Sequence, residues 1–107
     1  MLDRAFGACA HPIRRGILER LALDGELTVG EATHGFEVSK PAISRHLRVL
    51  EEAGAISRVI DGRTHRIRIQ EDALVAVGGW LEQQRELWER KFDVVEDFLA
   101  EQRRSRA

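Results

Sequence analysis

A segment rich in arginine is the feature of this sequence that could bind another molecule. Residues 40–69 contain seven basic and three acidic side chains, a net charge of +4, within a chain of 107 residues whose total net charge is −1. Residues 70–107 carry a net charge of −3, so charge is segregated along the chain. An arginine side chain can donate two hydrogen bonds to a guanine edge or to a phosphate. The basic segment therefore indicates either a solvated surface or a contact with double-stranded DNA.

Other reactive side chains are few. Cys9 is the one cysteine, which excludes an intramolecular disulfide and a multi-cysteine metal cage. It is expected to be a small apolar residue, although oxidation or pairing across a dimer stays open. No phosphate-binding loop, carboxylate pair or nucleophile–base motif is present, so the sequence predicts neither an enzyme nor a cofactor.

Membrane insertion is not indicated either. No apolar run approaches the roughly 18 residues that a membrane-spanning helix needs. Asp3 and Arg4 interrupt any hydrophobic region that a signal peptide would have near residue 1. We expect a soluble cytoplasmic protein in a reducing compartment, with no membrane partner.

Three helices are expected in the first 35 residues. Pro12 opens the second of them and His11 caps it, because proline fits the first turn of a helix. Thr28 and Glu31 have the spacing of a capping box at the start of the third. The predicted ranges are 2–10, 12–23 and 28–34.

A fourth, longer helix has two chemically different sides. Ser39 is placed to cap its start, and Gly54 follows its predicted end at Ala53. At 100° per residue, one side is apolar and must face the core, through Ile43, Leu47 and Leu50. The opposite side carries small polar and cationic residues, namely Lys40, Pro41, Ser44, Arg45 and Arg48.

A β-hairpin is expected next, with strands over residues 56–60 and 64–69 joined by Asp61-Gly62-Arg63. An Asp-Gly pair between β-branched runs is a strong hairpin signal. Alternation along the second strand predicts one buried and one basic face. The buried face carries His65, Ile67 and Ile69, and the basic face carries Arg66 and Arg68.

The last helix is expected over residues 72–102. Leu74, Leu81, Trp88 and Val95 repeat every seven residues, and further apolar rows lie beside them. This apolar surface is wider than packing within one small domain requires, which predicts a second chain. The candidate dimer-interface residues are Leu2, Phe6, Leu81, Leu87, Trp88, Phe92, Val95 and Leu99.

The length predicts a single domain over residues 1–107. Its expected parts are a DNA-binding core (1–71), a C-terminal dimerisation helix (72–102) and a flexible polar tail (103–107). The expected fold class is mainly α-helical with a small β-hairpin. A short helix, a tight turn, a long helix and a hairpin form a winged helix-turn-helix, in which the long helix enters the major groove of DNA.

The sequence resembles the ArsR family of winged-helix bacterial transcriptional regulators. The resemblance lies in residues 38–54 (VSKPAISRHLRVLEEAG), in the later Asp61-Gly62-Arg63, and in the upstream residues 11–18 (HPIRRGIL). Residues 80–99 resemble a subgroup with a long C-terminal dimerisation helix. The resemblance implies a homodimeric DNA-binding regulator, usually a repressor, with one recognition helix for each half-site of an inverted repeat.

The candidate DNA contacts lie on the fourth helix and on the hairpin. Arg45 and Arg48 are the best candidates for base or phosphate contact. About two of the four hairpin arginines are expected to reach phosphate or the minor groove, the four being Arg58, Arg63, Arg66 and Arg68. His46 and His65 are expected to be half-buried structural residues, and His34 has no evident role. The full set of candidates is Ser39, Lys40, Pro41, Ser44, Arg45, Arg48, Arg58, Arg63 and Arg66.

Metal sensing is not indicated. One metal site of the family uses a Cys-x-Cys pair, and here Thr28 and Gly30 hold those two positions. A second family site needs histidines on the last helix, but no histidine follows His65. Two other functions stay open: a winged-helix protein–protein adaptor, and a regulator that binds a small organic molecule near Trp80 and Trp88.

Overall fold

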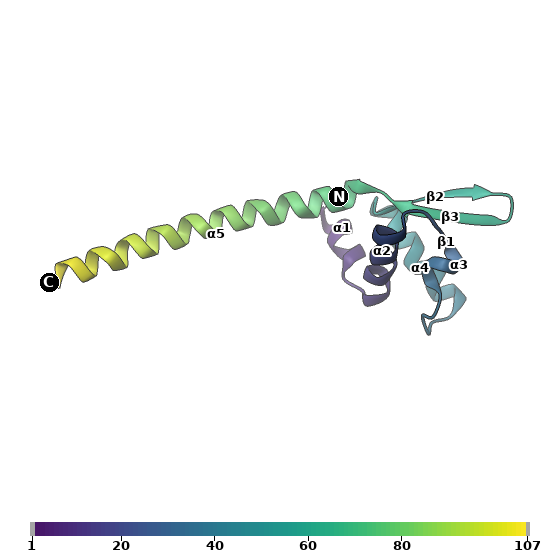
Figure 1. Ribbon diagram of the computed structural model, residues 1–107, viewed down its shortest axis with the longest axis horizontal. Helices are drawn as coiled ribbons and strands as arrows, with labels where there is room; N and C mark the ends of the chain where they lie inside the picture. The colour runs from purple at the N-terminus through teal and green to yellow at the C-terminus, as the bar shows by residue number, and fades with distance from the viewer. Residues whose placement is uncertain (1, 107) are drawn as a thin grey trace. The chain divides into compact units, whose positions relative to one another are not determined.

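The computed structural model describes residues 2–106, and over that range the chain forms five helices and three strands (Figure 1). Their order is α1, α2, β1, α3, α4, β2, β3, α5. The chain divides into two compact units, one ending at Val77 and the other beginning at Gly78. The first unit holds α1 to β3 and the first residues of α5.

The four helices of the first unit are α1 (Leu2–Cys9), α2 (Pro12–Asp24), α3 (Val29–Thr33) and α4 (Lys40–Glu52). Three of them begin at the predicted caps. His11 Nδ1 accepts a hydrogen bond from the Ile13 N–H at 3.1 Å. The Thr28 hydroxyl and the Glu31 carboxylate complete the capping box at 3.1 and 3.0 Å. The Ser39 hydroxyl accepts from the Ala42 N–H at 3.3 Å.

The sheet is larger than the sequence predicted. The hairpin of β2 (Ile56–Asp61) and β3 (Thr64–Ile69) is present, but β1 (Leu27–Thr28) pairs antiparallel with the other side of β3. Leu27 lies opposite Ile67 in that ladder. A two-residue strand has no periodicity to detect, which is why its sequence did not reveal it. The predicted class, mainly α-helical with a winged helix-turn-helix, is confirmed.

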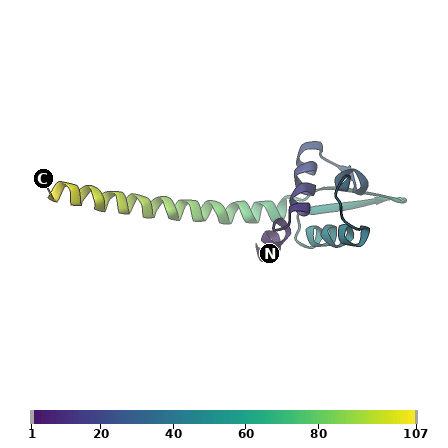
Figure 2. The same ribbon diagram turned by 90° about the horizontal axis from the view of Figure 1, so that it is seen from below.

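The hairpin turn consists of Gly62 and Arg63, between the paired residues Asp61 and Thr64. Gly62 has a φ of 62°, a conformation that glycine adopts without steric cost. Figures 1 and 2 show the tip of the hairpin extending beyond helices α3 and α4 in both views. The turn therefore presents Arg63 at the exposed end of the wing.

The core of the first unit lies between the helices and the sheet. Leu47 and Leu50 of α4 are 2% and 0% exposed, and they pack in one cluster with residues of α2 and β3. Ile43 is only partly buried against that cluster. The least exposed large side chains are Ile17, Leu21, Leu47, Leu50 and Ile67. The predicted apolar side of α4 is thus the side that holds it to the protein.

Helix α5 (Glu71–Ser105) begins in the first unit, where the Ala73 N–H donates to the carbonyl of Gly54 at 3.2 Å. The helix is continuous through Gly78-Gly79 and ends three residues beyond the predicted Gln102. Ala107 of the predicted tail lies outside the described residues. Among residues 2–106, no helix combines the length and the apolar character that crossing a membrane requires.

Leucine packing under α4 gives a first prediction. Leu50→Ala should lower the free energy of unfolding by about 2–5 kcal/mol, because a buried side chain is replaced by a cavity. Leu23→Ala is the matched control, since Leu23 is 85% exposed and its truncation should change stability by no more than about 0.5 kcal/mol. Urea unfolding at one protein concentration measures both. Equal effects of the two substitutions would contradict this packing.

Candidate nucleic-acid interface

The outer side of α4 is polar and cationic. Lys40, Pro41, Ser44, Arg45 and Arg48 are all exposed, as the sequence predicted. Arg45 and Arg48 form no hydrogen bond or ion pair within the described residues, so their guanidinium donors are available. Ser39 is also exposed, but its hydroxyl already caps the helix. The major groove of DNA is about 12 Å wide and admits one helix. A helix that is buried on one side and carries exposed arginine and serine on the other can enter it and contact base edges.

The far end of α4 is closed by a Schellman motif. Gly54 has a φ of 73°, its N–H donates to the Glu51 carbonyl at 3.1 Å, and the Ala55 N–H donates to the Leu50 carbonyl at 2.9 Å. The motif turns the chain directly from α4 into β2. It therefore links the position of the wing to that of the helix.

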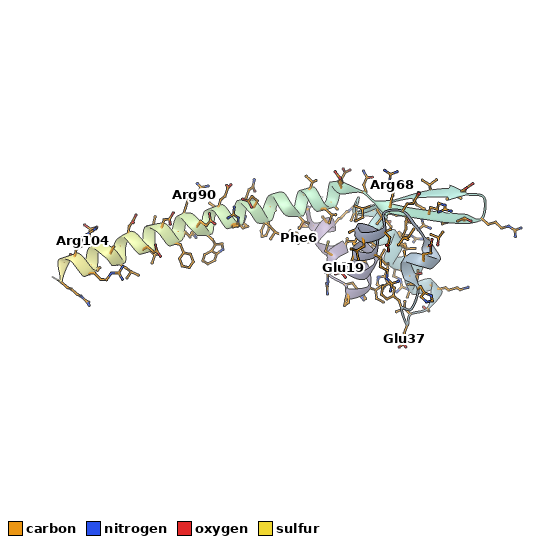
Figure 3. All side chains as sticks on the ribbon, in the orientation of Figure 1. Phe6, Glu19, Glu37, Arg68, Arg90 and Arg104 are labelled. Carbon is orange, nitrogen blue, oxygen red and sulfur yellow. The ribbon has the colours of Figure 1, made fainter. Side chains whose placement is uncertain are left out.

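The wing arginines do not share one environment. Arg63 is exposed at the turn. Arg68 projects from the side of the hairpin that is turned away from helices α2 and α4 (Figure 3), and Arg66, two residues earlier on β3, shares that face. The hydrogen bond from the Thr28 N–H is the main cause that lowers the pKa of the Glu31 carboxyl, and Arg66 lowers it further.

Arg58 is engaged inside the protein. It forms an ion pair with Glu51 of α4, and its Nη1 lies 3.0 Å from His65 Nδ1. Its side chain is only 22% exposed, and its buried Nε has no hydrogen-bond partner among the described residues. Contact between Arg58 and DNA, as proposed from the sequence, would require these interactions to break. The observed geometry favours a structural role that joins β2 to α4.

A groove of about 420 Å³ opens where α4, the wing and the start of α3 converge. Ser44 and Arg63 both line it, which brings one candidate from the helix and one from the wing to the same place. Two threonines that the sequence analysis did not select, Thr28 and Thr64, line it as well. Hydroxyl and guanidinium donors are the groups that bind phosphate oxygens.

His46 is half-buried at the edge of α4, as predicted. Its Nδ1 lies 3.0 Å from Arg14 Nη1, and its ring centroid lies 4.3 Å from that of His11. Arg14 also donates from Nε to the Ala8 carbonyl and from Nη2 to the Gly7 carbonyl, both at 2.9 Å. Burial, followed by the charges of His11, Arg14 and Arg45, lowers the pKa of His46.

Two arginines of α2 that are not among the candidates predicted from the sequence, Arg14 and Arg20, connect neighbouring segments of the first unit. Arg14 joins the last turn of α1 to α4. Arg20 donates to the His34 carbonyl at 2.8 Å and lies 4.3 Å above the Phe36 ring, so it supports the segment between α3 and α4. The sequence shows only that Arg14 and Arg20 lie on a helix with several charged residues. That pattern does not reveal carbonyl partners that are distant in the sequence.

The candidate dimer residues occupy both units. Leu2 and Phe6 of α1 are partly buried. The six candidates on α5 are between 48% and 65% exposed in the single chain: Leu81, Leu87, Trp88, Phe92, Val95 and Leu99. Cys9 is a free, half-buried thiol, and within residues 2–106 no group of three potential metal ligands comes together.

Comparison with known proteins identifies the same region. A family model of a helix-turn-helix domain matches residues 10–59, which run from the start of α2 into β2. The HTH-type transcriptional regulator Rv2034 of Mycobacterium tuberculosis is 53% identical over 51 residues, which are 48% of this chain and 47% of that protein. The transcriptional repressor SdpR of Bacillus subtilis is 41% identical over 52% of this chain and 61% of its own length. The chain thus spans about half the length of these relatives.

A solved structure extends the similarity to about four fifths of the chain. The crystal structure of an ArsR family transcriptional regulator is 38% identical, with a TM-score of 0.77, over 82% of this chain and 90% of that one. The names of these proteins describe transcriptional regulators, and the family model describes a helix-turn-helix domain. The resemblance first noted in residues 11–18 and 38–54 is confirmed, and this chain belongs to the ArsR family of winged helix-turn-helix transcriptional regulators.

Proposed function

We propose that this chain is a homodimeric, sequence-specific repressor that binds an inverted-repeat operator through α4 and the wing, without control by metal. The observation that carries the proposal is the outer side of α4, where Ser44, Arg45 and Arg48 are exposed while Leu47 and Leu50 hold the helix from behind. A regulator of this kind acts on chromosomal DNA, so we place it in the bacterial cytoplasm. Repression is proposed by analogy with SdpR, which is named a transcriptional repressor.

The adaptor alternative is not favoured. A protein-docking face is enriched in aromatic residues and depleted of charge at its centre. The exposed side of α4 carries no aromatic residue, and its charged members are the cations Lys40, Arg45 and Arg48, with one carboxylate, Glu52, at the last residue of the helix. That pattern matches a polyanion better than it matches a protein surface.

Dimerisation is proposed through the apolar side of α5. Leu81, Trp88, Phe92, Val95 and Leu99 fall within an arc of about 60° on a helix of 3.6 residues per turn. The ion pairs of the helix lie outside that arc, between Arg85 and both Glu82 and Glu89, and between Arg90 and Glu86. Exposed aromatic and aliphatic side chains at this density typically mark an interface.

A second copy of this chain is the proposed partner at this interface, because two α5 helices would cover each other's apolar stripe. A two-fold dimer reads two half-sites about 34–36 Å apart.

The DNA contacts are tested by selecting bound duplexes from a random library. Wild type should enrich an inverted repeat. On the selected duplex, Arg45→Ala should lose about 1–3 kcal/mol of discrimination at one base pair and tolerate other bases there. Arg63→Ala should weaken binding to all sequences alike and reduce the slope of log affinity against log salt by about one.

The control for this pair is Arg104→Ala, which removes an exposed cation from the last turn of α5 and should leave affinity unchanged. Fluorescence anisotropy at several salt concentrations gives all three affinities. Wild-type affinity in both Arg45→Ala and Arg63→Ala would refute the assignment of α4 and the wing.

The dimer is tested by Phe92→Glu, which places a charge within the apolar stripe and should convert the protein to a monomer with intact helical content. Sedimentation equilibrium measures the mass, and circular dichroism measures the helix. Arg90→Glu is the matched control, because Arg90 lies on the ion-paired side of the same turn and its replacement should leave a dimer. A wild-type protein that sediments as a monomer, or a Phe92→Glu variant that remains dimeric, would exclude this interface.

Independence from metal is proposed because the two family thiolate positions hold Thr28 and Gly30, and the Thr28 hydroxyl is engaged with the Glu31 N–H. Neither residue offers the soft ligand that a thiolate provides. DNA affinity should therefore be the same before and after treatment with a chelator, and the same after Zn²⁺ is added back. A change in affinity that chelation causes and Zn²⁺ reverses would overturn this part of the proposal.

A further inference from the structure

Arg14 links three helices through a single side chain. It belongs to α2, its Nε and Nη2 hold two carbonyls at the end of α1, and its Nη1 reaches His46 on α4. His46 stands next to Arg45, which points outward from the same helix. The hydrogen bond that His46 receives therefore links α4 to α1 and α2, in addition to the packing of Leu47 and Leu50 in the core.

The direction of that hydrogen bond fixes the protonation of His46. A guanidinium has donors and no acceptor, so Nδ1 of His46 must accept and must carry no proton. His11 is under the same constraint, because its Nδ1 accepts from the backbone N–H of Ile13. A protonated imidazole has an N–H at both ring nitrogens and can accept neither bond. Both contacts therefore exist only while the two histidines are neutral.

The surroundings of His46 oppose its protonation. The charged or titratable groups that act on it are His11 before α2, Arg14 of α2 and Arg45 of α4, and none of them is acidic. The groups of α1 that Arg14 contacts are the backbone carbonyls of Gly7 and Ala8, which are not carboxylates. Glu52 and Arg14 line the same neighbouring hollow, together with Arg4. A proton on His46 would add a third cation beside Arg14 and Arg45.

We propose that His11, Arg14 and His46 form a proton-sensitive clasp that holds the recognition helix in place, so that mild acidification reduces the protein's preference for its operator over other DNA. This inference rests on the proposed function, because it concerns the helix that is proposed to read the operator. Arg14 and His46 act here as positioning residues, and neither is required to touch DNA.

The sign of the effect follows from the lowered pKa of His46. The clasped state binds a proton less readily than a released or unfolded state, so its stability increases with pH. The contribution is fully present above the ordinary histidine pKa of about 6.5 and is lost as the pH falls through the lowered value. Affinity for the operator should fall by up to about tenfold for each pKa unit that separates the two states.

A general charge effect opposes this loss and has to be separated from it. Protonated histidines attract phosphate and strengthen binding to every duplex, whatever its sequence. The informative quantity is therefore the ratio of two affinities, one for the duplex selected at pH 7.5 and one for a scrambled duplex of the same length. The general attraction cancels in this ratio, while the loss of helix position does not.

The experiment measures that ratio between pH 7.5 and pH 5.5 for wild type, His46→Asn and His34→Asn. Asparagine offers Oδ1 near the position of Nδ1, accepts from Arg14 and does not titrate. The ratio should fall on acidification in wild type and should lose most of its pH dependence in His46→Asn. His34 is exposed and its side chain has no partner among residues 2–106, so His34→Asn should behave as wild type.

The outcomes separate the two proposals. If no duplex is enriched or bound at pH 7.5, the proposed function fails and this inference fails with it. If the selected duplex binds at pH 7.5 but the wild-type ratio is constant down to pH 5.5, or if His46→Asn retains the full wild-type pH dependence, the clasp alone is refuted.

A measurement on wild type covers the case in which His46→Asn does not fold. Imidazole ¹⁵N resonances should show Nδ1 of His46 unprotonated at pH 7.5, with a titration below the ordinary histidine pKa of about 6.5 and accompanied by shifts of the α4 amides. Titration of His46 at or above about 6.5, with the α4 amides unmoved, would overturn the proposal.

Discussion

The two-sided character of α4 is the constraint on which the rest of the site depends. Leu47 and Leu50 leave water almost completely, and burial of each is worth about 1.5–3 kcal/mol. Arg45 and Arg48 lie on the opposite side of the helix, so a rotation that buried them would expose these leucines. The Ser39 cap and the Schellman motif at Gly54 then fix where the helix begins and ends. Hydrophobic burial therefore determines which side chains of α4 lie at the surface, where the proposed function places DNA.

The arginines of the first unit are divided between structure and surface. Arg14, Arg20 and Arg58 use their donors on carbonyls, histidine rings or Glu51, and they hold the helices and the wing together. Arg45, Arg48 and Arg63 make no such bonds within the described residues and stand at the surface. This division explains how a chain of net charge −1 can offer a cationic face. Basic and acidic residues are concentrated in different segments of the sequence. Packing then separates the arginines that bond within the protein from those that remain at the surface.

Features that depend on neighbouring residues could be predicted from the sequence. The capping box at Thr28, the glycine that follows α4, the hairpin and the apolar side of α4 all follow from short-range patterns, and each was observed. Features that depend on distant partners could not. Strand β1 exists only because β3 is beside it. The engagement of Arg58 with Glu51 and His65 could not be predicted either, because these partners become neighbours only in the fold. The clasp of Arg14 and His46 joins residues 32 positions apart in the same way.

Backbone amide chemical shifts during titration with a selected duplex test the central claim most directly, because they report every residue of the surface at once. The account predicts that the largest changes fall in residues 39–48 and in the wing turn at residues 61–64, with smaller changes at Thr28 and Gly30 beside the shared groove. Exposed positions on α2 such as Leu23 should not respond. Changes confined to α5, or an α4 whose amides do not shift at saturation, would contradict the claim that this helix reads DNA.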